Sequence, residues 1–173
     1  RAATVICDVM CCGKVPKNSA LLRSGARAGD NIYVTGELGA SALGLATQRG
    51  AAWRRHKRPE PRLAAGLALR SLASAAMDLS DGLSLDLHRL CLESGVAAQL
   101  TGSLPVARGA TLDQALHGGE DYELLFTASP RTKIPPAIAG LPVTKIGAIQ
   151  KGRPGSIISN GKPVRLLGFD HFK

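Results

Sequence analysis

The sequence predicts an α+β fold, a layered α/β/α domain whose mixed sheet ends in a C-terminal hairpin. Short apolar, β-branched segments alternate with segments of helical periodicity along the 173 residues, which indicates a sheet covered by helices. Near the end, Asn160-Gly161 separates two strand-like segments and is a strong signal for a two-residue hairpin. Because 45% of the residues are hydrophobic and 20% are charged, a chain that is disordered throughout is excluded.

Local patterns place each element along the chain. Apolar runs bounded by glycine or proline predict strands over residues 4–12, 31–35, 75–79, 96–100, 122–127, 143–149, 156–159 and 162–166. Segments rich in alanine and leucine predict helices over residues 39–48, 62–73, 82–93 and 110–118. The proline-rich residues 130–140 predict a short irregular helix and loop.

Two of these helices carry leucines for burial. The expected core positions are Leu63, Leu67 and Leu69 in helix 62–73, and Leu83, Leu87 and Leu90 in helix 82–93. On the other face of helix 82–93, we expect Asp86 to pair with Arg89.

The net charge of +9 is concentrated in one segment. Residues 49–62 hold six basic residues and one acidic residue. We expect a solvated, mobile loop or helix end here; the alternative is a landing site for phosphate-bearing ligands or RNA. Because aromatic residues make up only 3% of the chain, with Trp53 alone in the basic segment, we expect no nucleic-acid partner.

Cysteine usage and hydropathy point to a cytoplasmic protein. Cys7, Cys11 and Cys12 lie near the start and are interpreted as buried, reduced thiols at a strand edge rather than zinc ligands, since Cys91 is isolated on a predicted helix. No apolar run approaches the length needed to cross a bilayer, and the first residues lack the order of a signal peptide. We therefore expect no membrane partner.

The first candidate site is the sequence Met-Asp-Leu-Ser-Asp-Gly at residues 77–82, where a buried strand meets a helix. Ser80 could cap the helix, and free backbone N–H groups there would attract phosphate. Asp78 and Asp81 could share one Mg²⁺ ion. The alternative is that Ser80 and Asp81 only cap the helix and balance its charge.

The second candidate site, residues 118–123, places three carboxylates in Gly-Gly-Glu-Asp-Tyr-Glu just before an apolar strand. Glycines allow a ligand to approach the backbone, and the carboxylates could accept hydrogen bonds from a cationic or amino-bearing substrate. A turn with solvated acids remains the alternative. Arg23 offers a guanidinium for phosphate, while no P-loop, G-x-G-x-x-G or G-x-S-x-G sequence is present.

Four blocks occur in order along the chain: RSGARAGDNIYVTG (23–36), MDLSDGLSLDL (77–87), GGEDYELLFT (118–127) and GFDHF (168–172). Together they resemble the C-terminal part of thiamine-monophosphate kinase, within the aminoimidazole ribonucleotide synthetase superfamily. The resemblance implies transfer of the γ-phosphoryl group of ATP to thiamine monophosphate, which gives thiamine diphosphate with Mg²⁺ as cofactor. Catalysis would then rest on positioning and charge neutralisation, because the acceptor phosphate is itself the nucleophile.

The resemblance also implies roles for single residues. Asp78 and Asp81 would be Mg²⁺ ligands, and Arg23 and Ser80 would contact ATP. Glu120 would face the thiamine moiety, with Glu123 as the reserve, and Phe169 could pack on the thiamine rings.

The resemblance further implies a domain boundary. Residues 1–22 would be the remnant of the last strand of an N-terminal ATP-binding domain and its linker, and residues 23–173 the C-terminal domain. In the family, the N-terminal domains pair into a homodimer, so the isolated chain is expected to be folded but inactive. The alternatives are an ATP-dependent synthetase of the same superfamily with another substrate, and a noncatalytic module that binds an acidic partner through residues 49–62.

Overall fold

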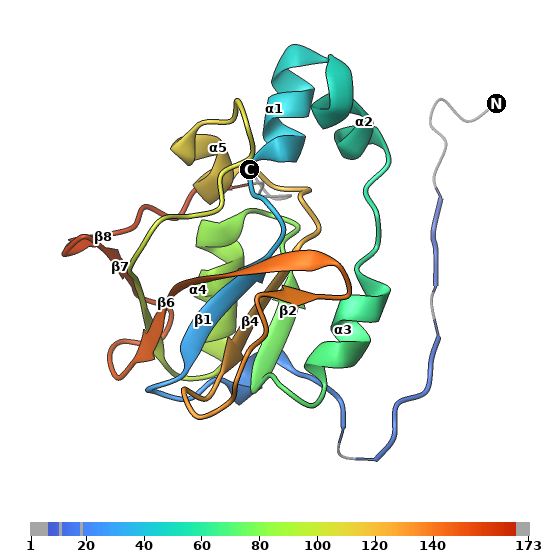
Figure 1. Cartoon of the computed structure of the whole chain (residues 1–173). Helices are drawn as coiled ribbons and strands as arrows, with labels where there is room; N and C mark the ends of the chain where they lie inside the picture. The colour runs from blue at the N-terminus through green and yellow to red at the C-terminus, as the bar shows by residue number, and fades with distance from the viewer. Residues whose placement is uncertain (1–6, 11, 18, 169–173) are drawn as a thin grey trace.

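The fold is built on one mixed sheet. The computed structural model describes residues 7–10, 12–17 and 19–168. The strands are β1 (Asn31–Thr35), β2 (Ala75–Asp78), β3 (Ala97–Leu100), β4 (Leu124–Ala128), β5 (Ala137–Ile138), β6 (Leu141–Gln150), β7 (Ile157–Ser159) and β8 (Lys162–Pro163). Their order is β2-β4-β1-β6-β3-β7-β8, with β5 paired to β6. Strands β3 and β7 are parallel and the other pairs are antiparallel, so the predicted mixed sheet is confirmed (Figure 1).

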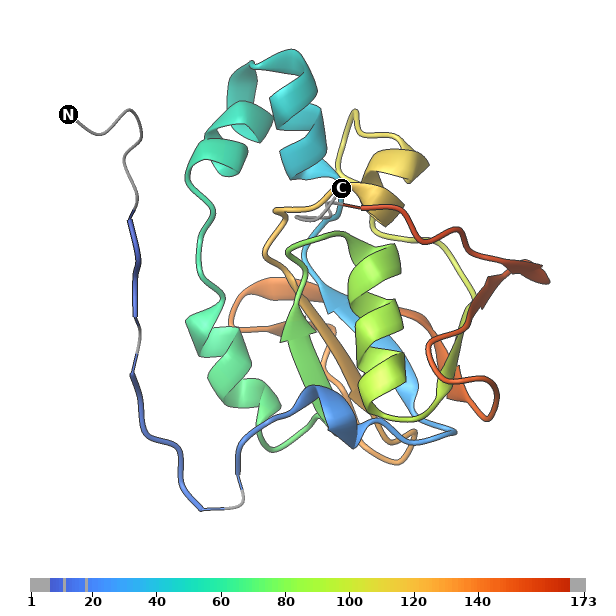
Figure 2. The same ribbon diagram turned by 180° about the vertical axis from the view of Figure 1, so that it is seen from behind.

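The helices lie on both faces and at one end of the sheet (Figures 1 and 2). They are η1 (Arg23–Gly25), α1 (Ala40–Thr47), α2 (Gly50–Lys57), α3 (Leu63–Leu69), α4 (Leu83–Glu93) and α5 (Leu112–His117). Helices α1 and α2 pack so closely that a Cβ added at Gly44 would collide with the carbonyl oxygen of Ala52. Glycine, which has no Cβ, permits this approach. None of the helices in the described part of the chain has the length and hydropathy needed to cross a membrane.

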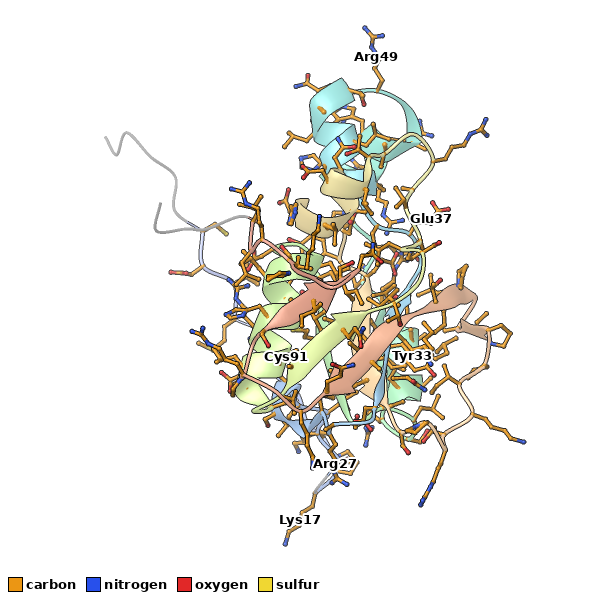
Figure 3. The ribbon with its side chains drawn as sticks, turned by 90° about the vertical axis from the view of Figure 1, so that its left-hand side faces the viewer. Lys17, Arg27, Tyr33, Glu37, Arg49 and Cys91 are labelled. Carbon is orange, nitrogen blue, oxygen red and sulfur yellow. The ribbon has the colours of Figure 1, made fainter. Side chains whose placement is uncertain are left out.

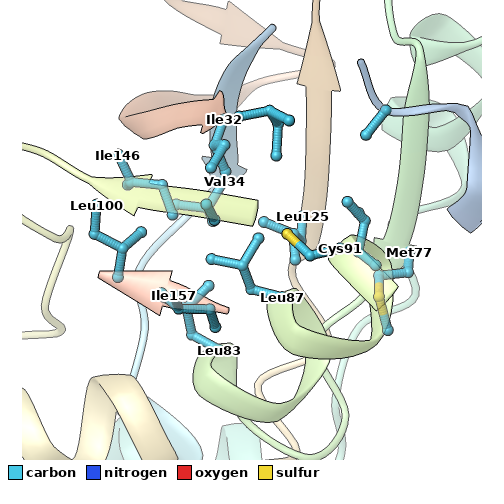
Figure 4. Close-up of a cluster of buried hydrophobic side chains, with 14 of the residues drawn as sticks. Ile32, Val34, Met77, Leu83, Leu87, Cys91, Leu100, Leu125, Ile146 and Ile157 are labelled. Carbon is cyan, nitrogen blue, oxygen red and sulfur yellow. The ribbon is translucent and has the colours of Figure 1, made fainter. Parts of the chain in front are cut away.

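One face of the sheet packs against α4. The leucines predicted for this helix, Leu83, Leu87 and Leu90, are buried, as the sequence predicts. They meet β-strand side chains such as Ile32, Val34, Leu125 and Ile146 (Figure 4). Burial of each such side chain stabilises the fold by about 1.5 to 3 kcal/mol relative to full exposure. This core fixes the junction between β2 and α4, where the first candidate site begins.

The opposite face packs against α3. Ala65 and Leu69 of α3 lie against Phe126, whose ring stacks on Tyr33 with 5.2 Å between the ring centroids. The prediction that Leu63 and Leu67 are buried is wrong, since both are exposed. The buried positions are Ala65 and Leu69, one helical turn apart, and the leucines at 63 and 67 point the other way.

The N-terminal residues differ most from the prediction. Residues 7–10 and 12 form no strand, and Val9 and Met10 are 82% and 88% exposed. Among the described residues, no strand pairs with this segment. Cys7 and Cys12 are exposed, so their predicted burial is wrong, and Cys11 lies outside the described residues. Cys91 is buried within α4 (Figure 3), and burial raises the pKa of its thiol to about 12.

The C-terminal hairpin is confirmed. Strands β7 and β8 pair antiparallel around Asn160 and Gly161, whose φ angles are 50° and 74°. A two-residue hairpin of the favoured type needs positive φ at both positions, which asparagine and glycine tolerate best.

Candidate functional site at the β2–α4 junction

The start of α4 is capped in a way that the sequence analysis did not predict. Gly82, with φ of 108°, is the N-cap, and no side chain caps the helix from that position, so the prediction that Ser80 is the cap is wrong. Instead, Oδ2 of Asp86 accepts hydrogen bonds from the backbone N–H groups of Asp81 (3.0 Å) and Gly82 (3.1 Å). The helix thus supplies its own carboxylate to these donors, and Ser80 stays available at the surface of the junction.

Asp86, Asp81 and Arg89 form a small charged network beside this cap. Arg89 pairs with Oδ2 of Asp81 and, at 3.2 Å, with Oδ1 of Asp86, which confirms the predicted Asp86–Arg89 pair. Burial raises the pKa of Asp86 to about 6, and the negative charge of Asp81 acts in the same direction. The pKa of Arg89 is raised, chiefly by its hydrogen bond to Asp81.

The loop that carries the second candidate site packs directly onto the first. The N–H of Glu120 donates to the carbonyl oxygen of Ser80 (2.7 Å), and the N–H of Tyr122 donates to that of Leu79 (2.9 Å). Glu120 and Tyr122 both have left-handed backbones, with φ of 62° and 50°. Non-glycine residues adopt this conformation rarely and at a cost, so the surrounding contacts must impose it.

Asp121 anchors the middle of this loop to α1. Its carboxylate accepts hydrogen bonds from the backbone N–H groups of Gly39 and Ser41, at the start of that helix. Its pKa is raised, because burial opposes its charge more strongly than these hydrogen bonds favour it. The other two acids of this motif, Glu120 and Glu123, lie in different surroundings.

Glu123 is fully buried, and Thr35 and two arginines of the basic segment are its partners. Thr35 donates to its Oε2 at 2.6 Å, Arg62 donates to its Oε1 at 2.8 Å, and Arg55 donates to the same Oε1. Burial alone lowers the pKa of the Arg62 guanidinium, but Glu123 and Glu60 raise it above its ordinary value. Residues 49–62 are thus neither a loose loop nor a fully solvated helix end: part of them is α2, and two of their arginines neutralise a buried carboxylate.

Glu120 instead faces a cavity of about 680 Å³. Its walls come from α1, α2, the β2–α4 junction and the end of α5. They include Ser41, His56, Ser80, Asp81, His117, Gly118, Gly119, Glu120, Tyr122 and Gly168. The structure therefore brings three of the predicted site residues, Ser80, Asp81 and Glu120, to one cavity.

The other two described candidates, Arg23 and Asp78, line a separate hollow of about 540 Å³ at the edge of β2. The pKa of Tyr122 depends on charges from both regions: it is raised by burial and by the charges of Glu120, Asp78 and Asp81. The negative charges of both motifs therefore oppose ionisation of one hydroxyl group. Phe169 lies outside the described residues.

Three cavity residues were missed from the sequence: Ser41, His56 and His117. His56 lies in the basic segment, and only the fold brings it beside Glu120, at 3.5 Å from Nδ1 to Oε2. His117 Nδ1 lies 2.8 Å from the hydroxyl of Ser84. His117 directly precedes the Gly118-Gly119 motif in the sequence, which is a signal that could have found it, whereas no spacing pattern links Ser41 or His56 to the two acidic motifs.

Asp78 and Asp81 line different cavities, so a Mg²⁺ ion held by either carboxylate would need phosphate oxygens and water as its further ligands. No group of three or more His, Cys, Asp or Glu side chains that could hold a metal occurs among residues 7–10, 12–17 and 19–168. Mg²⁺ commonly takes one or two protein carboxylates, with water and substrate phosphates completing its shell. Asp78 is exposed, and Arg89 contacts only Oδ2 of Asp81, so both can contribute an oxygen.

Comparison with solved structures defines the class of fold. The match to the hydrogenase maturation protein HypE in complex with ATP covers 92% of this chain and 56% of the HypE chain, with a TM-score of 0.66 at 15% identity. PurL of T. maritima in complex with ATP gives a TM-score of 0.62 at 15% identity, over 87% of this chain and 27% of its own. The chain therefore has the fold of the aminoimidazole ribonucleotide synthetase-like proteins, as the sequence predicts.

Within this class, the chain is similar to thiamine-monophosphate kinases. It is 42% identical to the enzyme of Salmonella typhimurium over 92% of this chain and 58% of that protein, and 32% identical to that of Bacillus subtilis over 99% and 62%. The structure of the Stenotrophomonas maltophilia enzyme matches with a TM-score of 0.74 at 35% identity, over 87% of this chain and 56% of its own. AaThiL complexed with AMPPCP and TMP gives a TM-score of 0.76 at 33% identity, over 88% and 54%.

These matches confirm the resemblance stated from the sequence. The chain spans a little more than half the length of the curated relatives it matches, 58% of the Salmonella typhimurium enzyme. No family model matches the chain.

Proposed function

We propose that this chain is the C-terminal part of an ATP-dependent thiamine-monophosphate kinase, which transfers the γ-phosphoryl group of ATP to thiamine monophosphate. The observation that carries the proposal is the 42% identity to such a kinase over 92% of the chain. The cavity agrees with the proposal, because its carboxylates, glycines and hydroxyl groups suit a cationic substrate that carries phosphate. The acceptor phosphate is the nucleophile, so no protein nucleophile is needed.

The phosphate end of the proposed site uses the β2–α4 junction. Ser80 and Arg23 would donate hydrogen bonds to ATP, and Asp78 and Asp81 would hold Mg²⁺. When bound, Mg²⁺ would neutralise the charge on the phosphate oxygens. The chain's own contribution is positioning: β2 and α4 fix the two aspartates, and Arg89 keeps Asp81 in one orientation.

The thiamine end of the proposed site uses Glu120. Its carboxylate is 55% exposed within the cavity wall, so a positively charged or amino-bearing ring can reach it. Glu123 is the weaker candidate, because a ligand would have to displace Arg55 or Arg62 to contact it. Phe169 is proposed to pack on the thiamine rings, in line with the resemblance.

The domain boundary belongs to the same proposal. Residues 23–173 would form the C-terminal domain, and residues 1–22 would lead into it from an N-terminal ATP-binding domain. In support, the first helix begins at Arg23, and residues 7–10 and 12–17 pair with no strand. A homodimer of the full-length protein in the cytoplasm is also proposed, with ATP as co-substrate and Mg²⁺ as cofactor.

The test compares the intact gene product with this 173-residue chain. Thiamine diphosphate formation is measured from thiamine monophosphate, ATP and Mg²⁺ by chromatography. We expect turnover by the intact protein and none by the isolated chain. A folded intact protein that makes no thiamine diphosphate would overturn the proposal and direct the search to other ATP-dependent synthetase reactions. Salt-sensitive RNA binding that is lost when Arg54, Arg55 and Arg58 are neutralised would instead favour the noncatalytic module.

A further inference from the structure

His56 connects the α1–α2 pair of helices to Glu120. Its Nδ1 lies 2.8 Å from the hydroxyl oxygen of Ser41 and 3.5 Å from Oε2 of Glu120. Nδ1 can act as a donor toward Glu120 only in the tautomer that carries hydrogen on Nδ1, and the direction of the Ser41 hydrogen bond depends on the same tautomer. The ring is 16% exposed, which leaves little room for it to swing away.

The ring is also fixed from its face. Trp53, one turn earlier in α2, stacks on it with 5.4 Å between centroids and 14° between planes. Lys57 in turn lies over the Trp53 ring, with its Nζ 5.0 Å from the ring centroid. At its edge, Ser41 is fully buried and its own N–H is held by Asp121. His56 is therefore contacted on its face by Trp53 and at its edge by Ser41.

Glu120 combines a fixed backbone with an exposed side chain. Its left-handed backbone is held by the hydrogen bond from its N–H to Ser80, while its carboxylate is 55% exposed. Within the described part of the chain, His56 is the partner that the structure gives for that carboxylate. A flexible glutamate loses rotational freedom when it binds a ligand, and a neighbour that holds it in place beforehand reduces that cost.

We propose that His56 is a positioning residue, which holds the Glu120 carboxylate toward the cavity so that it meets the thiamine-bearing acceptor without rearrangement. This inference rests on the proposed function. Because the effect is on binding of the acceptor, it acts on the KM for thiamine monophosphate and leaves the KM for ATP and the kcat alone.

Steady-state kinetics of the intact protein test this role with three variants. His56→Phe keeps a ring to stack on Trp53 but removes the donor, and we expect the acceptor KM to rise about tenfold. His56→Asn restores an N–H near the position of Nδ1 and should bring the KM back to within about twofold of the unsubstituted value. His88→Phe is the control, because His88 bonds the carbonyl oxygen of Gly155 at 2.8 Å and is not among the residues that line this cavity.

A double variant tests whether His56 acts through Glu120. If it does, His56→Phe has no further effect on the acceptor KM once Glu120→Gln is present, so the double variant matches Glu120→Gln alone. Independent, multiplying effects would overturn the proposal. An unchanged KM in His56→Phe would do the same.

NMR separates this inference from the proposed function, because it needs no turnover. In the 173-residue chain, the carboxyl carbon signal of Glu120 should shift in His56→Phe and stay in place in His88→Phe. If the chemical shift of the Glu120 carboxyl carbon is unchanged in His56→Phe, the positioning role is overturned, whatever the substrate is. If the signal shifts but the intact protein makes no thiamine diphosphate, the kinase proposal fails and the link between the two side chains stands.

Discussion

The guanidinium of Arg62, in the basic segment, forms an ion pair with the buried carboxylate of Glu123, which directly precedes β4. Their Nη2 and Oε1 atoms lie 2.8 Å apart, Glu123 is fully buried and Arg62 is 12% exposed. Arg55 reaches the same oxygen from α2. A charge pair removed from water adds little net stability when intact, but loss of one member leaves an uncompensated charge inside the protein.

Glu123→Gln is therefore expected to lower the free energy of unfolding by about 3 to 5 kcal/mol, because two arginines would then face a neutral amide. Urea unfolding followed by circular dichroism measures this loss. Glu37→Gln is the matched control, since Glu37 is exposed and projects from the surface (Figure 3) and should cost no more than about 0.5 kcal/mol. Equal effects of the two variants would show that the buried network contributes nothing to stability.

Asp86 gives the fold a defined pH dependence. Its folded-state pKa of about 6 lies above its ordinary value of 3.8, so the folded state binds the proton more tightly than the unfolded state does. The free energy of unfolding should therefore fall as the pH rises from about 4 to about 6, by about 2 to 3 kcal/mol from this group. Above that range the contribution is constant.

Asp86→Asn isolates this contribution, because asparagine keeps an oxygen for the N–H groups of Asp81 and Gly82. The difference in unfolding free energy between the unsubstituted chain and the variant is measured by urea titration at intervals from pH 4 to pH 7. Asp121, whose pKa is also raised, is present in both proteins and cancels in the difference. A difference that stays constant over this range contradicts the prediction.

Gly119 is the point where the two acidic motifs touch. A Cβ at this position would collide with the carbonyl oxygen of Ser80 and lie 3.2 Å from Cα of Asp81. Gly119→Ala must push the Glu120 loop away from the junction, at a cost of about 1 to 3 kcal/mol. In α3, Gly66→Ala meets nothing nearer than Leu124 Cδ1 at 4.0 Å and should instead stabilise the helix by up to about 1 kcal/mol. Thermal unfolding of both variants checks the opposite signs.

The sheet, α4 and the C-terminal hairpin could be predicted because their signals are local. Leucines at helical spacing and Asn160-Gly161 report on the few residues around them. Leu63 and Leu67 were misjudged because both faces of α3 offer leucine or alanine, and contacts across the fold, such as the one with Phe126, decide which face is buried. Local pattern cannot supply that contact.

The site divides in the same way. The two acidic motifs could be found because carboxylates beside glycine at the ends of apolar strands are unusual enough to be noticed. His56 could not, since it lies 64 residues before Glu120 and its neighbours in sequence, Arg55 and Lys57, are basic residues with no pattern that points to the cavity. The partner of Arg55 and Arg62 was hidden for the same reason, because pairing across the fold leaves no periodicity in the chain.

Substitution of Asp81 is expected to affect turnover much more than stability. In the intact protein, Asp81→Asn should lower the kcat for thiamine diphosphate formation by at least about a hundredfold, because a proposed Mg²⁺ ligand and its charge are lost together. Arg89 keeps Asp86 as a partner, and the Asp81–Arg89 pair is partly exposed, so the loss of stability should stay near 1 kcal/mol. Kinetics and thermal unfolding of the same samples, with Glu37→Gln as the control, measure both quantities. Full activity in Asp81→Asn would remove this carboxylate from the site, whereas equal losses of activity and folded protein would make it structural only.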